Sequence, residues 1–387
     1  MADNPDTDFR LFQLGERSIL EITSTKAMDE LDTLVPDIID RTEPEHTVIG
    51  HLMPKAFVLL RTTEDMEKRK KATIAALGVH KASTNILKMI VSVDTFINTL
   101  QIGQEINFQK LAQHIIFENL SCQLLGEDYR NINLSFGYTC PGTGEVLNLS
   151  FSEFFIKLCK SEVAAFSNPM VKVLQPFSNF CNLIEPFKTN RKNNLYLRKR
   201  LLELAEASTD PNSMYKILMR SGEFSSEDWI MDVIAMIFIW LSTTSSGLSS
   251  CVYFTKKNPE VYAKLMQEIY KCKLHLADEI HPENLGDYFN NCDYLNYVVK
   301  EALRFDTPWP ITLPYKAYET VDLWGVTILK GQELTIGIPY AHFNPKQWHR
   351  PSEFLPERFD PKSELFFKPG TKLMRHPTSF NAFSTGK

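Results

Sequence analysis

A glutamate and an arginine three residues apart have the types and the spacing to form an ion pair inside the protein. Glu301 and Arg304 stand in the run KEALRF, and residues three apart on a helix lie on one face, where the two side chains can pair. Most such pairs are solvated and worth only about 0.3–0.5 kcal/mol. Arg358, in the run PERF, offers a second guanidinium, whose planar fork suits a shared carboxylate. We predict that the three residues form one buried, hydrogen-bonded network.

The elements that must position these residues are mainly helical. Apolar side chains recur at helical spacing in four segments: 63–114, 106–125, 227–250 and 297–305. The third of these is nearly all apolar, which is typical of a buried central helix. Strand patterns occur at about 9–23 and 307–337, and a turn-rich connection is expected at 131–149. The sequence predicts a mostly α fold with a minor β region and a helical core at about 63–305.

Composition excludes several classes of protein. The 387 residues are 43% hydrophobic and 23% charged, which indicates a globular chain, and the net charge of −5 gives no basic field for nucleic acid. The seven cysteines include no CxxC pair and the histidines show no HExxH motif, so no zinc site or disulfide framework is indicated. A reducing compartment is expected. The apolar stretch 230–241 is too short to span a membrane, and the polar N-terminus is unlike a signal peptide.

The order of four motifs resembles that of the cytochrome P450 family, the haem-thiolate monooxygenases, over nearly all of the chain. The motifs are the strand pair with LGERSILEITS, the central helix with TTSSGLS followed by NPEVYAKLMQEI, the ExxR helix at Glu301, and PERF. Their joint order is highly specific. The resemblance implies a single cytochrome P450-like domain over residues 1–387, incomplete at its N- and C-termini, with haem as cofactor.

The end of the sequence resembles the start of the family's haem loop, F-x-x-G-x-R-x-C-x-G. Residues 338–387 run from PERF into this loop, and the resemblance assigns Phe383 and Gly386 to cofactor binding. The ligand cysteine would lie three residues past Lys387, and none of the cysteines present has such a context. The chain is therefore expected to be truncated there and before its first strand, and to hold no metal ligand.

The family's central helix reads A/G-G-x-D/E-T-T, in which the acid and the threonine help to deliver protons for oxygen activation. The aligned run here is IWLSTT, so the resemblance assigns catalytic roles to Thr243 and Ser242. Ser242 replaces the acid, and a hydroxyl relays a proton without supplying negative charge. Trp240 replaces a glycine and shares a helical face with Thr243, which predicts that it restricts the space over the haem. The alternative is an ordinary core tryptophan with its ring turned aside.

The resemblance also implies cations for the haem propionates. The run EKRKK (67–71) covers the family's W-x-x-x-R, where Met66 replaces the aromatic residue and Lys70 supplies the cation. Either Tyr315 or Lys316 occupies the second propionate-binding position.

The other basic residues of this run are expected to face an electron-donating reductase, through which NADPH acts only indirectly. These residues are Lys68, Arg69 and Lys71, and positive charge there would steer association. A solvated helix face explains the same charges equally well.

The segment TPWPITL (307–313) resembles the family's loop beside the haem. Ile311 and Thr312 are expected to touch substrate, with a rigid proline turn as the alternative. His342, in YAHFNP, is expected to make a structural hydrogen bond and not to bind iron.

Three hypotheses of function follow. The first is a haem-dependent monooxygenase that acts on a small apolar organic substrate and is inactive in this truncated form. The second is a catalytically silent or haem-free scaffold, which Ser242, Trp240 and the missing cysteine favour. The third is a haem-thiolate enzyme that rearranges peroxides without a redox partner. An intact parent with an anchor is compatible with the endoplasmic reticulum membrane.

Overall fold

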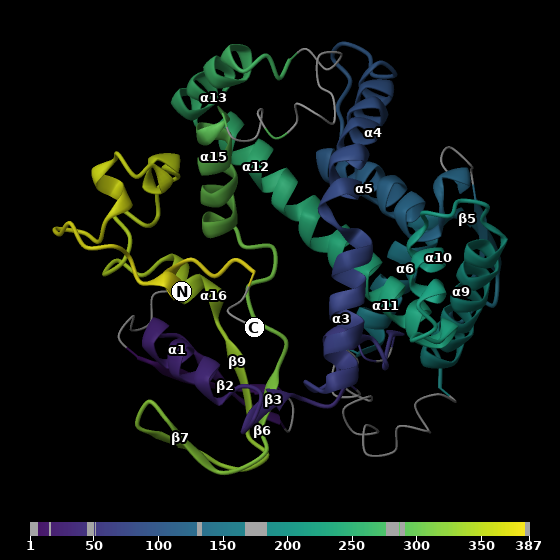
Figure 1. Cartoon of the computed structure of the whole chain (residues 1–387), viewed down its shortest axis with the longest axis horizontal. Coiled ribbons are helices and arrows are strands. Elements are labelled where there is room, and N and C mark those ends of the chain that lie inside the picture. Colours follow the sequence, from purple (N-terminus) through teal and green to yellow (C-terminus); the bar gives the residue numbers. More distant parts are fainter. Residues whose placement is uncertain are drawn as a thin grey trace. The chain divides into compact units, whose positions relative to one another are not determined.

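The computed structural model describes residues 7–14, 17–44, 50, 52–129, 134–166, 184–275, 286 and 291–383. In this part of the chain the fold is mostly helical with small sheets, as predicted (Figure 1). The helices are α1 (Thr25–Leu34), α3 (Glu64–Leu77), α4 (Val79–Ile97), α5 (Phe108–Leu125), α6 (Phe151–Phe166), α9 (Phe187–Ala207), α10 (Met214–Arg220), α11 (Ser226–Ile239), α12 (Ser245–Lys257), α13 (Pro259–Lys271), α15 (Asp293–Phe305) and α16 (Ile338–His342). The strands are β1 (Phe9–Leu14), β2 (Arg17–Ile22), β3 (Ile39–Arg41), β4 (Ser135–Thr139), β5 (Val146–Ser150), β6 (Tyr315–Ala317), β7 (Val321–Leu323), β8 (Val326–Ile328) and β9 (Glu333–Ile336).

The chain divides into two compact units that alternate along the sequence. One unit consists of residues 1–42, 83–113 and 242–387, and the other of residues 43–82 and 114–241. That all 387 residues form one domain stays a prediction.

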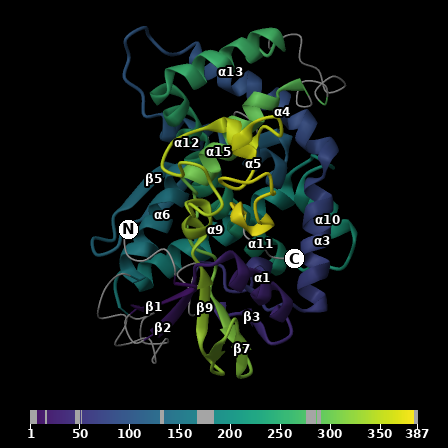
Figure 2. The ribbon, with the colours of Figure 1, turned by 90° about the vertical axis from the view of Figure 1, so that its left-hand side faces the viewer.

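The first unit is built on a five-stranded sheet with the order β1-β2-β9-β6-β3 (Figure 2). β2 and β9 are parallel, and the other neighbours are antiparallel, so residues from both predicted strand regions meet in one sheet. Helix α1 begins where the Ser24 hydroxyl accepts a hydrogen bond from the Ala27 amide at 3.2 Å. Its buried Met28 and Leu31 pack in one apolar cluster with sheet residues such as Ile336.

The connection at 131–149 contains more structure than the sequence predicts. Strands β4 and β5 form an antiparallel hairpin in this region of the second unit. In the run SFGYT the aromatic side chains alternate with small residues, so that Phe136 and Tyr138 both point inward and are buried. Phe136 stacks on Phe151 at the start of α6, with ring centroids 4.8 Å apart. The hairpin is thus stabilised by aromatic packing on one face.

The predicted central helix is present, with an irregular turn in its middle. Helices α11 and α12 are joined by a π-helical segment, Trp240–Thr244. Trp229 to Ile237 are all buried, as expected for a helix that is apolar on every side. Among the described residues, the continuous helical stretch 226–257 is long and apolar enough to cross a membrane by length and composition, and most of its apolar window is buried in the protein.

Helix α3 carries a buried ion pair within the second unit. Arg69 and Asp232 are each 3% exposed, and the guanidinium donates to both carboxylate oxygens, at 2.7 and 3.1 Å. The Arg69 guanidinium also donates to the Lys55 carbonyl oxygen at 3.0 Å, and the Phe57 amide donates to Asp232 at 2.8 Å. Burial raises the pKa of Asp232 to about 6, while the Arg69 charge favours the ionised form. The pair joins α3, α11 and the segment around Lys55.

This pair corrects one prediction about the basic run. Arg69 does not face a reductase, because it lies on the buried face of α3 with Thr73 and Ala76, at positions i, i+4 and i+7. Lys68 and Lys71 lie on the exposed faces of the same helix and pair with glutamates one turn earlier, at 3.0 and 3.8 Å.

We predict that Asp232→Ala lowers the free energy of unfolding by about 3–5 kcal/mol, because it leaves the Arg69 guanidinium buried without its carboxylate. Urea denaturation measures the change. Lys68→Ala on the same helix is the matched control and is expected to change stability by less than about 0.5 kcal/mol, since its ion pair is exposed. Equal effects of the two substitutions would contradict this assignment.

Candidate functional site

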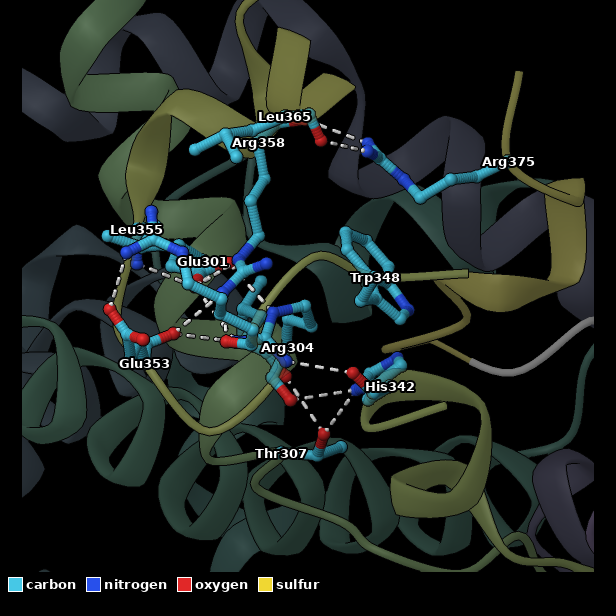
Figure 3. A network of polar contacts seen from close by, with 12 residues as sticks. Glu301, Arg304, Thr307, His342, Trp348, Glu353, Leu355, Arg358, Leu365 and Arg375 are labelled. Atoms are coloured by element: carbon cyan, nitrogen blue, oxygen red, sulfur yellow. Dashed lines mark hydrogen bonds and ion pairs between the residues drawn. The ribbon is translucent and has the colours of Figure 1, made fainter. Parts of the chain in front are cut away.

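The structure brings Glu301, Arg304 and Arg358 together in one network (Figure 3). Helix α15 places Glu301 and Arg304 one turn apart, and the Arg304 guanidinium donates to both carboxylate oxygens at 2.8 Å. Arg358, from the short 3-10 helix η7 (Pro356–Phe359), donates to the same carboxylate at 3.1 Å. All three residues are 0% exposed. One carboxylate therefore lies between two guanidiniums that are shielded from bulk solvent.

Backbone carbonyl oxygens accept the other hydrogen bonds of the two arginines. Arg304 donates to the carbonyl of His342 at 2.8 Å, and both arginines donate to the carbonyl of Glu353, at 3.3 and 3.0 Å. Burial lowers the pKa of Arg358, and the Glu301 carboxylate opposes that shift. The partial negative charges of these carbonyl oxygens compensate the second guanidinium. The hydrogen bonds to them hold the segment that precedes PERF against α15.

Arg375 extends this region and was not singled out by the sequence analysis. Its guanidinium lies 4.2 Å from the centre of the Trp348 ring and donates to the carbonyl oxygens of Leu365, Phe366 and Arg358, at 2.9, 2.6 and 2.8 Å (Figure 3). Burial, followed by the charge of Arg358, lowers the pKa of Arg375 to about 10. No motif marks this arginine in the sequence; only its position among aromatic residues could have suggested a stacked cation.

His342 makes structural hydrogen bonds through both ring nitrogens. Its Nδ1 atom lies 2.9 Å from the Thr307 hydroxyl and 3.1 Å from the Arg304 carbonyl, while Nε2 accepts from the Asn381 amide at 3.1 Å. This pattern assigns the proton to Nδ1 and keeps the ring neutral. Burial, with the nearby Arg304 charge, lowers the pKa of His342 to about 3. The ring thereby joins the end of α15 to the segment that precedes Phe383.

The hydroxyl residues expected to act in catalysis lie at the irregular turn of the central helix. Ser242, Thr243 and Trp240 all belong to the π-helical segment and are partly exposed, whereas most of α11 before them is buried. π-Helical turns inside α-helices often occur at functional sites. One turn later, Gly247 in α12 lies close to Pro308 and Leu303, so α12 packs against α15 and the proline-rich segment after it.

The two residues expected to touch substrate differ in their surroundings. Thr312 is 7% exposed, and its hydroxyl accepts from the Ile336 amide at 3.0 Å, which ties it to strand β9. Ile311 is 43% exposed and pairs through its backbone with Gly337. Ile311 is therefore the better candidate for a ligand contact.

The residues expected to bind the cofactor lie on several elements. Met66 and Lys70 are partly exposed and one helical turn apart on α3. Lys316 is partly exposed on β6, 5.9 Å from the centre of the Tyr318 ring, whereas Tyr315 is buried. Phe383 is 84% exposed, and Gly386 lies outside the described residues.

No group of three or more His, Cys, Asp or Glu residues that could hold a metal ion occurs among the residues that the structure describes.

Comparisons with known proteins show the family and the fold of the chain. The sequence profile of the Cytochrome P450 family matches residues 9–387. The chain is similar to Cheilanthifoline synthase from Eschscholzia californica, with 26% identity over 183 residues, 46% of this chain and 36% of the relative. It is also similar to Cytochrome P450 3A29 from Sus scrofa, with 32% identity over 149 residues, 38% of this chain and 28% of the relative. The matched region spans about a third of the length of these curated relatives.

Among solved structures, the fold is similar to that of retinoic acid-bound cyanobacterial CYP120A1. The TM-score is 0.75 at 16% identity, and the match covers 98% of this chain and 79% of the other. The likeness therefore extends over nearly the whole chain, at the level of the fold.

We predict that Glu301→Ala lowers the free energy of unfolding by about 3–5 kcal/mol, because two buried guanidiniums then lack their carboxylate. Soluble yield and urea denaturation measure the loss. Glu353→Ala is the matched control, since that side chain pairs with Arg350 at the surface and its backbone carbonyl is retained. A soluble Glu301→Ala protein with an unchanged melting temperature would show that the network does not stabilise the fold.

A pH dependence of stability follows from His342. Its pKa is about 3 in the folded chain and near 6.5 when unfolded, so below pH 6.5 the unfolded chain takes up a proton that the folded chain does not. Stability should therefore fall by about 1.4 kcal/mol per pH unit from this residue as the pH drops below 6.5. His342→Gln is expected to flatten the slope between pH 6 and 4, whereas His114→Gln, at an exposed site in α5, is expected to leave it unchanged. Identical slopes in all three proteins would refute the assignment.

Proposed function

Because the chain belongs to the cytochrome P450 family, we propose that it serves a haem-dependent monooxygenase that acts on a small apolar organic substrate. The observation that carries the proposal is the π-helical segment Trp240–Thr244. It interrupts the central helix where the family's oxygen-side residues align, and it leaves the hydroxyl side chains of Ser242 and Thr243 partly exposed.

Part of the haem site can be assigned to residues of this chain by their chemistry. Met66 and Lys70 share one face of α3, where in this proposal they contact the ring and pair with a propionate. Lys316 keeps the role of a second propionate-binding cation only as the resemblance to the family implies it. Burial raises the pKa values of the Cys251 and Cys292 thiols to about 11 and 12, so both are protonated in the chain without haem. When bound, the haem supplies the oxygen-activating chemistry.

Thr243 and Ser242 are the residues that move protons in this proposal. Each has a hydroxyl that can both donate and accept a hydrogen bond, so the two can pass a proton along the irregular turn. Neither carries a negative charge. We therefore assign proton relay to these side chains and proton supply to solvent. Ile311, exposed beside the sheet, contributes to an apolar substrate surface.

We assign the docking of an electron-donating reductase to the exposed lysines of α3. Lys68 and Lys71 keep their ammonium groups in solvent, with exposed glutamate partners, whereas Arg69 does not. Such charges act mainly on the rate of association.

A second candidate function is a haem-thiolate isomerase that rearranges peroxides. It is favoured by Ser242 at the position of the family's acid and by Trp240 at that of its glycine, both within the π-helical segment. Such a reaction requires neither a reductase nor a proton relay. A catalytically silent scaffold is the remaining alternative.

The experiment that separates these functions uses Thr243→Ala in the haem-loaded, full-length protein with a reductase. We expect the substitution to divert at least ten times more of the consumed NADPH to hydrogen peroxide than to product, because the relay is lost. Retinoic acid, bound by the structural relative, is the first substrate probe. Thr243→Ser restores the hydroxyl and is the matched control.

Turnover of an organic hydroperoxide without reductase, unaffected by Thr243→Ala, would favour the isomerase. No turnover of either kind by the haem-loaded wild type would favour the silent scaffold.

A further inference from the structure

Helices α13 and α15 of the first unit lie side by side (Figure 1) and share an apolar cluster. Leu265 and Val261 on α13 pack with Val298 on α15 in this cluster, and all three are buried. The chain leaves α13 at Lys271 and enters α15 at Asp293, so that each helix end carries a cysteine: Cys272 follows α13 and Cys292 precedes α15.

The side chain of Glu268 fixes these two helix ends to each other. One carboxylate oxygen accepts from the Tyr294 amide at 2.8 Å, and the other accepts from the Leu295 amide at 2.7 Å. Glu268 thus caps the first turn of α15 from the last turn of α13. Cys272 lies four residues after Glu268 and its amide donates to the Glu268 carbonyl at 2.8 Å, so its side chain is directed toward α15 as well.

The two thiols meet at this junction. The Cys272 sulfur donates to the carbonyl oxygen of Asn291 at 3.3 Å, and that carbonyl belongs to the peptide bond that leads into Cys292. Cys292 is 1% exposed, whereas Cys272 is partly exposed. Burial, followed by a hydrogen bond between the Cys292 and Cys272 side chains, raises the pKa of the Cys292 thiol to about 12. The partly exposed Cys272 thiol therefore lies next to the buried Cys292 thiol.

We propose that Cys272 and Cys292 are a redox-active pair that forms a reversible disulfide between the end of α13 and the start of α15 when a hydroperoxide is present. The Cys272 thiol loses its proton, and the thiolate attacks one oxygen of hydrogen peroxide and breaks the O–O bond. The released hydroxide takes up a proton, so that this step gives a sulfenic acid on Cys272 and one water. The Cys292 sulfur then attacks the Cys272 sulfur, loses its proton and displaces a second water. Two thiols and one hydrogen peroxide thus become one disulfide and two waters.

The order of these steps follows from the difference in solvent exposure between the two thiols. Cys272 reacts first because an oxidant can reach it, and the buried Cys292, a poor nucleophile as a protonated thiol, acts only on an adjacent sulfenic acid. The disulfide would close a loop between residues 272 and 292 and hold the first turn of α15, the helix that carries Glu301 and Arg304 two to three turns later.

The test treats the full chain with hydrogen peroxide at about an equimolar ratio, blocks free thiols and digests it without reductant. We expect one cross-linked peptide containing Cys272 and Cys292, two hydrogens lighter than the sum of its parts, which dithiothreitol separates. The melting temperature is expected to rise by several degrees on oxidation and to return on reduction, because the unfolded chain is constrained.

Cys272→Ser removes the reacting thiol and is expected to abolish both the cross-link and the temperature shift. Cys251→Ser, at a partly buried thiol in α12 outside this junction, is the matched control and is expected to retain both. Recovery of Cys292 as a free, blocked thiol while Cys272 is oxidised to sulfinic acid or linked to another chain would overturn the proposal.

Discussion

The described part of the first unit depends on a single carboxylate that two arginines share out of water. Removing a charged group from water costs several kilocalories per mole unless partners compensate it, and Glu301 alone cannot neutralise both guanidiniums. The carbonyl oxygens of His342 and Glu353 supply the difference, and those oxygens are held in place only if the surrounding backbone is fixed. The need to compensate the second guanidinium therefore constrains the backbone between α16 and PERF.

The second unit uses the same principle with a different pair. Asp232 interrupts an otherwise apolar helix and is compensated by Arg69, by the Phe57 amide and by contacts from the Arg69 guanidinium to nearby carbonyls. In the part of the chain that the structure describes, each unit thus contains a buried ionic centre that joins segments far apart in sequence. A shift that separated the partners of such a centre would leave a buried charge unpaired, which is strongly destabilising, whereas apolar packing tolerates alternative side chains.

The sequence was informative where chemistry and spacing are local. Glu301 and Arg304 are one turn apart, and PERF has a recognisable composition, so the network could be predicted before the structure. Arg69 could not be separated from its basic neighbours, because its partner Asp232 is 163 residues away and its burial follows only from how α3 packs. The hairpin at β4–β5 and the stacking of Arg375 likewise depend on tertiary aromatic contacts, and the sheet contacts of Thr312 depend on pairing with β9.

The central claim is that the Glu301 network makes α15 and the chain from His342 to Arg358 one cooperative unit. Native-state hydrogen exchange with mass spectrometry tests it directly, by following the amides of Leu355 and Asn381, whose acceptors are Glu301 and His342, together with those of α15. The account predicts that these amides share one free energy of opening under limiting denaturant, and that Glu301→Gln lowers it for all of them together. Exchange at Leu355 and Asn381 that is faster than in α15 and insensitive to Glu301→Gln would contradict it.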